Sequence, residues 1–190
     1  MRRRRFGRDQ RGMAAVEFAL ITPILVLLAL GCFEVPSYVL VFQKMSRASA
    51  GVADLVAQAD DPVTKDQLID IFSGAKSMMQ PYDVVNDGEV IVTSINNPSG
   101  TGVKITWQRK NGLVATASKL GSSGTPANLP AGLTPAADEE VLVAEVYYNY
   151  KPMFGNIIYK GSQLYRVSYT RPRNHNLETV PPTDLTPSDQ

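Results

Sequence analysis

Hydrophobic and polar residues follow two successive patterns along the first third of this 190-residue chain. From Met13 onward nearly every side chain is apolar over roughly 20–25 residues, the length that a bilayer-spanning helix needs. From Phe42 to Ala59, apolar residues recur every three or four positions with polar residues between them, as on one face of a helix. We therefore expect one long helix, Ala14 to Ala59, whose first part faces lipid and whose second part covers a globular domain.

Beyond residue 60 the pattern predicts a second helix and an antiparallel sheet. Thr64-Lys65-Asp66-Gln67 has the form of a capping box. Apolar residues follow it at helical spacing: Leu68, Ile71, Phe72, Ala75 and Met79. Segments with β-branched or alternating patterns between turn residues are typical of strands: Glu89–Ile95, Val103–Arg109, Val141–Tyr150 and Leu164–Thr170, with Leu113–Thr116 as a further short strand. The expected fold class is α+β, with two helices and a sheet of about four strands.

Composition indicates where the segments of the chain begin and end. We expect a basic leader (1–12), the long helix (13–59), an α+β domain outside the membrane (60–170) with a flexible loop (121–137), and a disordered, proline-rich tail (171–190).

Positive charge is concentrated at the start of the chain. The first 12 residues contain one aspartate and six arginines: Arg2, Arg3, Arg4, Arg5, Arg8 and Arg11. Their net charge is +5, and since the whole chain has +1, the remainder has −4. Such a run can bind nucleic acid. Directly before an apolar helix, however, the arginines favour a leader that stays on the cytoplasmic side of the membrane under the positive-inside rule. We therefore expect no nucleic-acid partner.

Two other interpretations of the N-terminal region predict different proteins. A secretory signal peptide would end in a small-residue cleavage site, whereas here the helix continues as an amphipathic one. A lipoprotein signal would use Cys32, but Ala29 stands where leucine is usual, and the residues after Cys32 are not a polar tether. The alternative function is thus a membrane-anchored or lipoprotein binding module outside the cytoplasm. Otherwise Cys32 is a small buried hydrophobic residue.

Residues suited to catalysis or metal binding are few. His175 is the single histidine and Cys32 the single cysteine, so neither a catalytic triad nor a zinc site is expected. Six tyrosines could form a ligand-binding face, but sheet aromatics more often serve core and cross-strand packing: Tyr147, Tyr148, Tyr150, Tyr159, Tyr165 and Tyr169. We expect no enzymatic activity and no cofactor.

The start of the apolar helix contains a carboxylate that is costly in lipid. Glu17 is the fifth residue after Gly12, in the segment Arg11-Gly12-Met13-Ala14-Ala15-Val16-Glu17-Phe18. An acidic side chain costs about 2.5–3.5 kcal/mol at the bilayer centre and less near the interface. This segment resembles the cleavage site of type IV prepilins. With Thr22-Pro23-Ile24-Leu25 and Glu34, it is similar to the TadE/TadG-like family, minor pilin-like proteins of tight-adherence (Flp-type) pilus systems. Tyr148–Met153 and Tyr169–Arg173 also resemble family members.

The resemblance implies a pilin-like protein of the inner membrane with a periplasmic C-terminal domain. A prepilin peptidase would cut between Gly12 and Met13, and Glu17 and Phe18 would serve processing and assembly. The implied partners are that peptidase, other pilins and pseudopilins, the platform proteins of the pilus, and the lipid bilayer. Major subunits of this pilus class are little longer than the helix, so this chain is expected to be a minor subunit.

Overall fold

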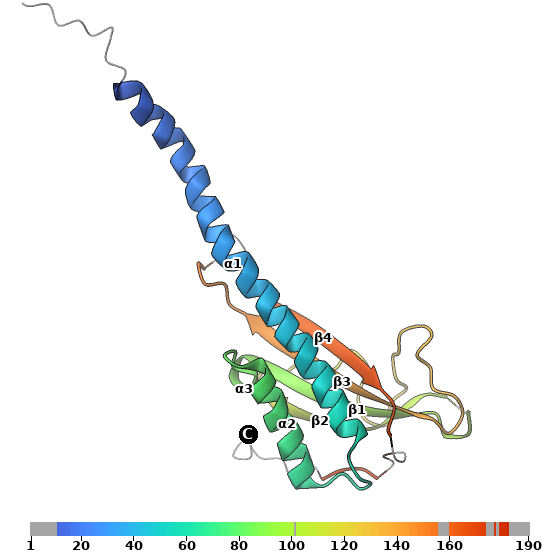
Figure 1. The fold of residues 1–190 in the computed structure, drawn as a ribbon. Coiled ribbons are helices and arrows are strands. Elements are labelled where there is room, and N and C mark those ends of the chain that lie inside the picture. The colour runs from blue at the N-terminus through green and yellow to red at the C-terminus, as the bar shows by residue number, and fades with distance from the viewer. Residues whose placement is uncertain (1–10, 101, 156–159, 174–176, 178, 183–190) are drawn as a thin grey trace, which may run out of the picture. The chain divides into compact units, whose positions relative to one another are not determined.

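The structure of the chain is a computed structural model that describes residues 11–100, 102–155, 160–173, 177 and 179–182. Within these residues, four strands form one antiparallel sheet in the order β2-β1-β3-β4. In chain order the elements are α1 (Arg11–Ala57), α2 (Lys65–Met79), α3 (Val84–Asp87), β1 (Gly88–Asn96), η2 (Pro98–Gly100), β2 (Lys104–Gly112), β3 (Glu140–Tyr150) and β4 (Ser162–Thr170) (Figure 1). The predicted α+β class is confirmed.

The chain forms two compact units, and the boundary between them falls inside α1. Unit 1 contains the described parts of Met1–Val39 and Lys151–Gly161, and unit 2 contains those of Leu40–Tyr150 and Ser162–Gln190. In unit 2, α1 buries apolar side chains at three- and four-residue spacing: Val41, Met45, Ala48, Val52 and Val56. The predicted amphipathic second part of the helix is therefore confirmed, although the helix ends at Ala57, two residues earlier than expected.

Helix α2 starts at the predicted capping box. The Thr64 hydroxyl oxygen accepts a hydrogen bond from the Gln67 backbone N–H (3.3 Å), and the Gln67 side-chain oxygen accepts one from the Thr64 N–H (2.9 Å). These two bonds satisfy donors that a helix end leaves unpaired. The buried residues of α2 are the five predicted ones: Leu68, Ile71, Phe72, Ala75 and Met79.

Both faces of the sheet are covered. In β4, the Arg166 guanidinium carbon lies 3.5 Å from the centre of the Phe42 ring of α1. Arg166 is the register partner of Val146 in β3, so α1 covers the face on which Val146 lies. On the opposite face, irregular residues contribute to a second apolar cluster of Ile95, Ile105, Leu120, Val141 and Val143.

The register between β1 and β3 depends on a glycine. Gly88 begins β1 opposite Tyr148, and a Cβ at this position would lie 2.3 Å from the Tyr147 carbonyl oxygen. Any side chain would therefore push the two strands apart.

The prediction of a short strand at Leu113–Thr116 is wrong. The chain leaves the sheet after β2 ends at Gly112, where the Leu113 N–H donates to the Val85 carbonyl of α3 (2.7 Å). It crosses the sheet face instead, where the Thr116 N–H donates to the Glu89 carboxylate (2.7 Å). The loop 121–137 is irregular as expected, and the Ile105 N–H donates to the Thr125 carbonyl (3.0 Å). The flexibility of this loop stays a prediction.

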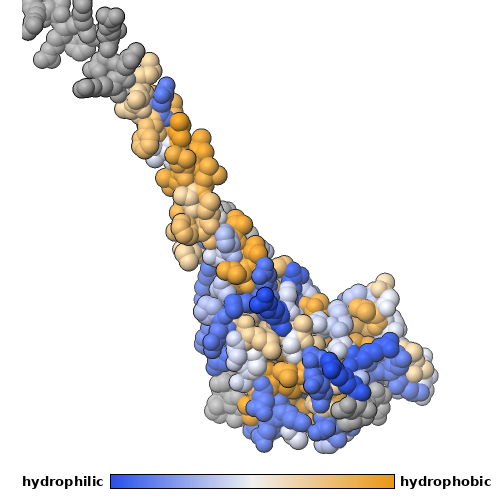
Figure 2. Space-filling model, in the orientation of Figure 1, coloured by the Kyte–Doolittle hydropathy of each residue, from blue (hydrophilic) through white to orange (hydrophobic). Residues whose placement is uncertain are grey.

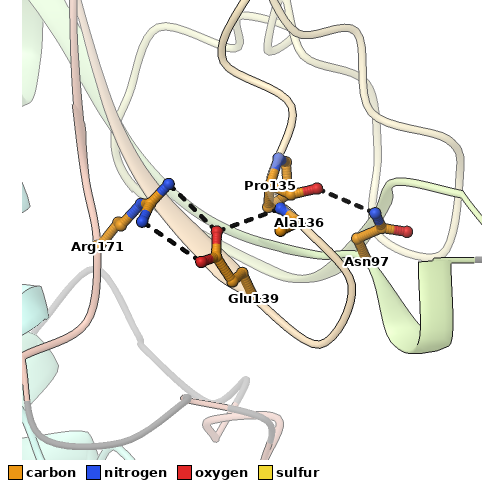
Figure 3. A network of polar contacts seen from close by, with 5 residues as sticks. All are labelled: Asn97, Pro135, Ala136, Glu139 and Arg171. Atoms are coloured by element: carbon orange, nitrogen blue, oxygen red, sulfur yellow. Dashed lines mark hydrogen bonds and ion pairs between the residues drawn. The ribbon is translucent and has the colours of Figure 1, made fainter.

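Polar contacts attach the end of this loop to two strands (Figure 3). The Asn97 side-chain amide donates to the Pro135 carbonyl (3.0 Å), and the Ala136 N–H donates to the Glu139 carboxylate (3.2 Å). Glu139 also forms an ion pair with Arg171, just after β4 (3.2 Å). The loop is thereby held where it enters β3.

Disorder of the tail stays a prediction, and residues 174–176, 178 and 183–190 lie outside the described residues. Some of the described residues after 170 contact the domain. Leu177 is 1% exposed, and its carbonyl accepts a hydrogen bond from the Trp107 indole N–H (2.8 Å). The Leu177 N–H donates to the Glu140 carboxylate, and the Thr179 N–H donates to Asp61 (3.1 Å). A polar, proline-rich composition favours disorder, but a buried tryptophan requires an acceptor, and this segment supplies it.

Truncating Leu177 should therefore destabilise the folded chain. We expect Leu177→Ala to lower the free energy of unfolding by about 2–5 kcal/mol, as for other fully buried leucines. Val180→Ala is the matched control, because Val180 is 56% exposed and should change stability by less than about 0.5 kcal/mol. Denaturant titration of the full chain in detergent, followed by the fluorescence of Trp107, measures both. Equal effects of the two variants would contradict the packed position of Leu177.

Candidate processing site and membrane helix

The predicted cleavage junction lies in the first turn of α1. The helix begins at Arg11, so Gly12 and Met13 are its second and third residues. Both are exposed, and a Cβ added at Gly12 would have no atom within 4 Å among the described residues. Helix ends fray, and glycine is about 1 kcal/mol less favourable in a helix than alanine. The helical conformation of this turn is therefore only weakly favoured.

Glu17 lies one turn after Met13 on the same face of α1. Both Glu17 and Phe18 are exposed, and Glu17 has no hydrogen-bond partner among the residues that the structure describes. The structure thus brings Glu17 close to the residue that would become the new N-terminus. The leader arginines 2, 3, 4, 5 and 8 lie outside the described residues, and so does His175.

In unit 1, α1 exposes large apolar side chains along its length. Figure 2 shows them on the face in view. Among the described residues, one helix (Gly12–Ala57) is long and apolar enough to cross a membrane, by length and composition. It continues through Pro23 and Pro36. The expectation that Cys32 is buried is wrong within the chain itself, because its side chain is exposed. A bilayer around this helix would cover it.

Glu34 is an exception on this exposed helix because its side chain is only 3% exposed. Its carboxylate accepts hydrogen bonds from the backbone N–H groups of Met153 (3.0 Å) and Phe154 (3.4 Å). The Phe154 ring also meets the Phe33 ring edge-on, with 6.3 Å between their centres. These contacts lie within unit 1. Sequence reasoning missed this site because nothing in the sequence pairs residue 34 with residues 153 and 154.

The tyrosines of the sheet surround a buried carboxylate in unit 2. Glu145 is 0% exposed and accepts hydrogen bonds from the hydroxyls of Tyr147 (3.0 Å) and Tyr165 (3.1 Å). It also accepts from the Lys119 backbone N–H (3.1 Å) and the Ser118 hydroxyl. Each group has a partner inside the chain, so these contacts favour cross-strand packing over a ligand-binding face.

Burial is the main cause that raises the pKa of Tyr147 and of Tyr165 above the ordinary value. The nearby Glu145 charge contributes in the same direction, because a second negative charge beside it is unfavourable. Both hydroxyls therefore stay protonated and donate to the carboxylate at neutral pH. Their role is structural.

Two cavities of unit 2 are smaller than typical ligand sites. One, of about 220 Å³, lies between the end of α1 and α2 and is lined by residues that include Leu55, Gln58 and Ile71. Another, of about 200 Å³, lies beside β4, near Tyr169 and Arg171. Small-molecule sites usually enclose about 300–1,000 Å³. Within the described residues, no three His, Cys, Asp or Glu side chains gather where they could hold a metal ion.

Comparison with known proteins bears on the N-terminal part of the chain. A family model described as TadE-like protein matches residues 12–54. This segment contains the junction at Gly12, the carboxylates of Glu17 and Glu34, and the whole exposed apolar part of α1. The resemblance to TadE-like proteins is therefore confirmed over these residues, which supports an association with a pilus system. No curated protein and no solved structure matches the chain.

The raised tyrosine pKa values predict a loss of stability in base. The ordinary tyrosine pKa is about 10, so the unfolded chain ionises first as the pH rises above that value. The contribution of the protonated hydroxyls is complete below about pH 10 and is lost progressively above it. Phenolate absorbance should show Tyr147 and Tyr165 ionising only as the circular dichroism of the fold is lost, whereas the denatured chain titrates in one step. Ionisation of all eight tyrosines with the fold intact would contradict the network.

Proposed function

We propose that this protein is a minor pseudopilin that takes part in assembling a tight-adherence, type IV-like pilus. The observation that carries the proposal is the TadE-like match over residues 12–54. The same residues contain a glycine–methionine junction, a carboxylate five residues after the glycine, and an exposed apolar helix. Pilin-like assembly needs these three features and requires neither a cofactor nor an enzymatic activity of the chain.

In this proposal the chain spans the inner membrane once. The arginines of the leader stay in the cytoplasm under the positive-inside rule, and the domain of unit 2 lies in the periplasm. An inner-membrane prepilin peptidase cuts the bond between Gly12 and Met13. The exposed position of both residues and the absence of a Gly12 side chain support access of the enzyme to this bond.

Cleavage creates a positive amino group at Met13, one helical turn from Glu17. We propose that the Glu17 carboxylate pairs with the new amino terminus of a neighbouring subunit, as Phe18 and the surrounding apolar side chains pack between helices. Two opposite charges in a low-dielectric environment recover part of their desolvation cost when they pair, and the pair defines an axial register. The exposure of Glu17 and its lack of a partner among the described residues support this role.

The size of unit 2 supports a minor subunit rather than the main filament subunit. Its partners would be other pilins and pseudopilins and the platform proteins of the inner membrane. The chain after the leader has a net charge of −4, which does not favour nucleic acid as a partner.

Processing can be tested by the intact mass of the membrane-extracted protein. Cells with the pilus peptidase should yield a chain that starts at Met13, and cells without it should yield the full-length chain. Gly12→Val should leave most of the protein full-length, because a branched side chain at the junction blocks close approach to the backbone. Gly31→Val is the matched control, since Gly31 also has no atom within 4 Å of an added Cβ, and it should be cut normally. Identical masses with and without the peptidase would refute processing.

The role of Glu17 can be tested separately from cleavage. Glu17→Gln removes the charge with little change of shape, so we expect a processed chain that no longer co-purifies with other pilus components after detergent extraction. Glu17→Asp keeps the charge and should retain part of the association. Normal association of the Glu17→Gln chain would show that the carboxylate has no part in assembly.

A further inference from the structure

The loop that contacts Glu34 carries exposed apolar side chains of its own. We define the docked loop as Lys151–Gly155, which follows β3 and belongs to unit 1 together with the first part of α1. We propose that the docked loop enters the outer boundary of the bilayer and forms a second lipid contact beside the spanning helix. This inference rests on the membrane span of the proposed function.

The length of α1 places the docked loop at a defined depth. Met13 and Phe33 are 20 residues apart, and a helix rises about 1.5 Å per residue, so about 30 Å separates them, the thickness of a hydrocarbon core. When Met13 lies at the inner boundary, Phe33 and Glu34 reach the outer one. The backbone of residues 153 and 154 is hydrogen-bonded to Glu34 and therefore lies at that boundary as well.

The composition of the docked loop suits this depth. Met153 is 68% exposed, and Phe33 of α1, whose ring meets that of the next loop residue Phe154, is 63% exposed. Phe154 is half-buried because its ring packs on Phe33. Lys151 is exposed at the start of the loop, and lysine side chains near a membrane interface extend their charge toward the headgroups. Apolar tips with an adjacent cation are typical of segments that lie in the interface.

The Glu34 carboxylate stabilises the docked loop at the outer boundary of the bilayer. A bare carboxylate at the edge of the hydrocarbon would be unfavourable, and so would two unpaired backbone N–H groups. The hydrogen bonds from Met153 and Phe154 satisfy the carboxylate and two donors of the loop together. Glu34 is therefore a positioning residue that holds the backbone of Met153 and Phe154 against α1 at the depth of Phe33.

Lipid is favoured over a protein partner by continuity with the apolar surface of α1. Exposed apolar side chains line the helix from Met13 to Leu40. The docked loop joins this surface where Phe154 packs on Phe33, and Met153, just before Phe154, is exposed. The same bilayer that covers the helix would cover the docked loop without a further binding partner.

Spin labels on single cysteines can measure the depth directly. In the Cys32→Ser background, the full chain in vesicles of phosphatidylethanolamine and phosphatidylglycerol would carry a label at F33C, M153C or L133C. Leu133 is the control, because it is 38% exposed in the loop between β2 and β3 of unit 2. We expect labels at residues 33 and 153 to be relaxed by oxygen and protected from a water-soluble nickel chelate. The label at residue 133 should show the reverse.

The outcomes separate this inference from the proposed function. If the label at residue 153 behaves like that at 133 while the label at 33 is in lipid, the span stands and the docked loop is not a lipid contact. If the label at 33 is itself open to the nickel chelate, the span fails and the inference fails with it. Protection at residue 153 from both reagents, with spin–spin broadening that is lost on dilution with excess lipid, would indicate a protein contact and overturn the proposal.

A second pair of variants tests the positioning role of Glu34. Glu34→Ala removes the acceptor, so the label at M153C should shift toward nickel accessibility while the label at F33C stays in lipid. Glu34→Gln keeps a side-chain oxygen that can accept and should retain most of the protection. An unchanged label at residue 153 in the Glu34→Ala chain would refute the role of Glu34.

Discussion

The irregular segments of this protein depend on one kind of interaction, a buried glutamate that accepts a backbone N–H. Four glutamates are buried among the described residues: Glu34, Glu89, Glu140 and Glu145. Each accepts at least one hydrogen bond from the main chain of a segment that is neither helix nor strand. A charged acceptor makes such a bond roughly twice as strong as a neutral one. It also makes the bond obligatory, because a buried carboxylate without donors is very unfavourable.

This arrangement explains how a four-stranded sheet covers both of its faces with only two long helices. Helix α1 covers one face, and the other is covered by a chain segment with little apolar surface. Glu89 and Glu145 lie on that second face and hold the segment through Thr116, Ser118 and Lys119. Because the loss of either partner leaves a buried group unsatisfied, the cost of disruption exceeds the net gain of the bond. The loop is thus fixed by these polar contacts in addition to the apolar packing of Leu120.

Local signals in the sequence are sufficient to predict the two long helices and the four strands. The capping box at Thr64 and the five buried positions of α2 follow from spacing alone, as do the four strands and the change of pattern within α1. The short strand expected at Leu113–Thr116 fails because propensity does not reveal that the chain leaves the sheet after Gly112, where the N–H groups of Leu113 and Thr116 bond to Val85 and Glu89. The buried position of Leu177 could not be predicted, because one leucine among polar residues and prolines leaves no pattern in the sequence.

The candidate site shows the same division between local and long-range information. Gly12, Met13, Glu17 and Phe18 were found from the sequence because they lie within seven residues of one another. The contact of Glu34 with Met153 joins residues 119 positions apart. No spacing rule reaches that far, and a single sequence provides no pairing information. A carboxylate late in an apolar run nevertheless signals that some donor must be supplied from elsewhere in the chain.

The contact between Trp107 and Leu177 has a consequence for the order of events during biosynthesis. The two residues are 70 positions apart, and the indole N–H lacks its acceptor until residue 177 has emerged from the ribosome. The apolar part of α1 emerges more than a hundred residues earlier. In the proposed topology, the helix therefore reaches the membrane while unit 2 is still incomplete, and the sheet crosses as an open chain. In that topology insertion precedes folding, because residue 177 contributes to the core and is made long after the helix.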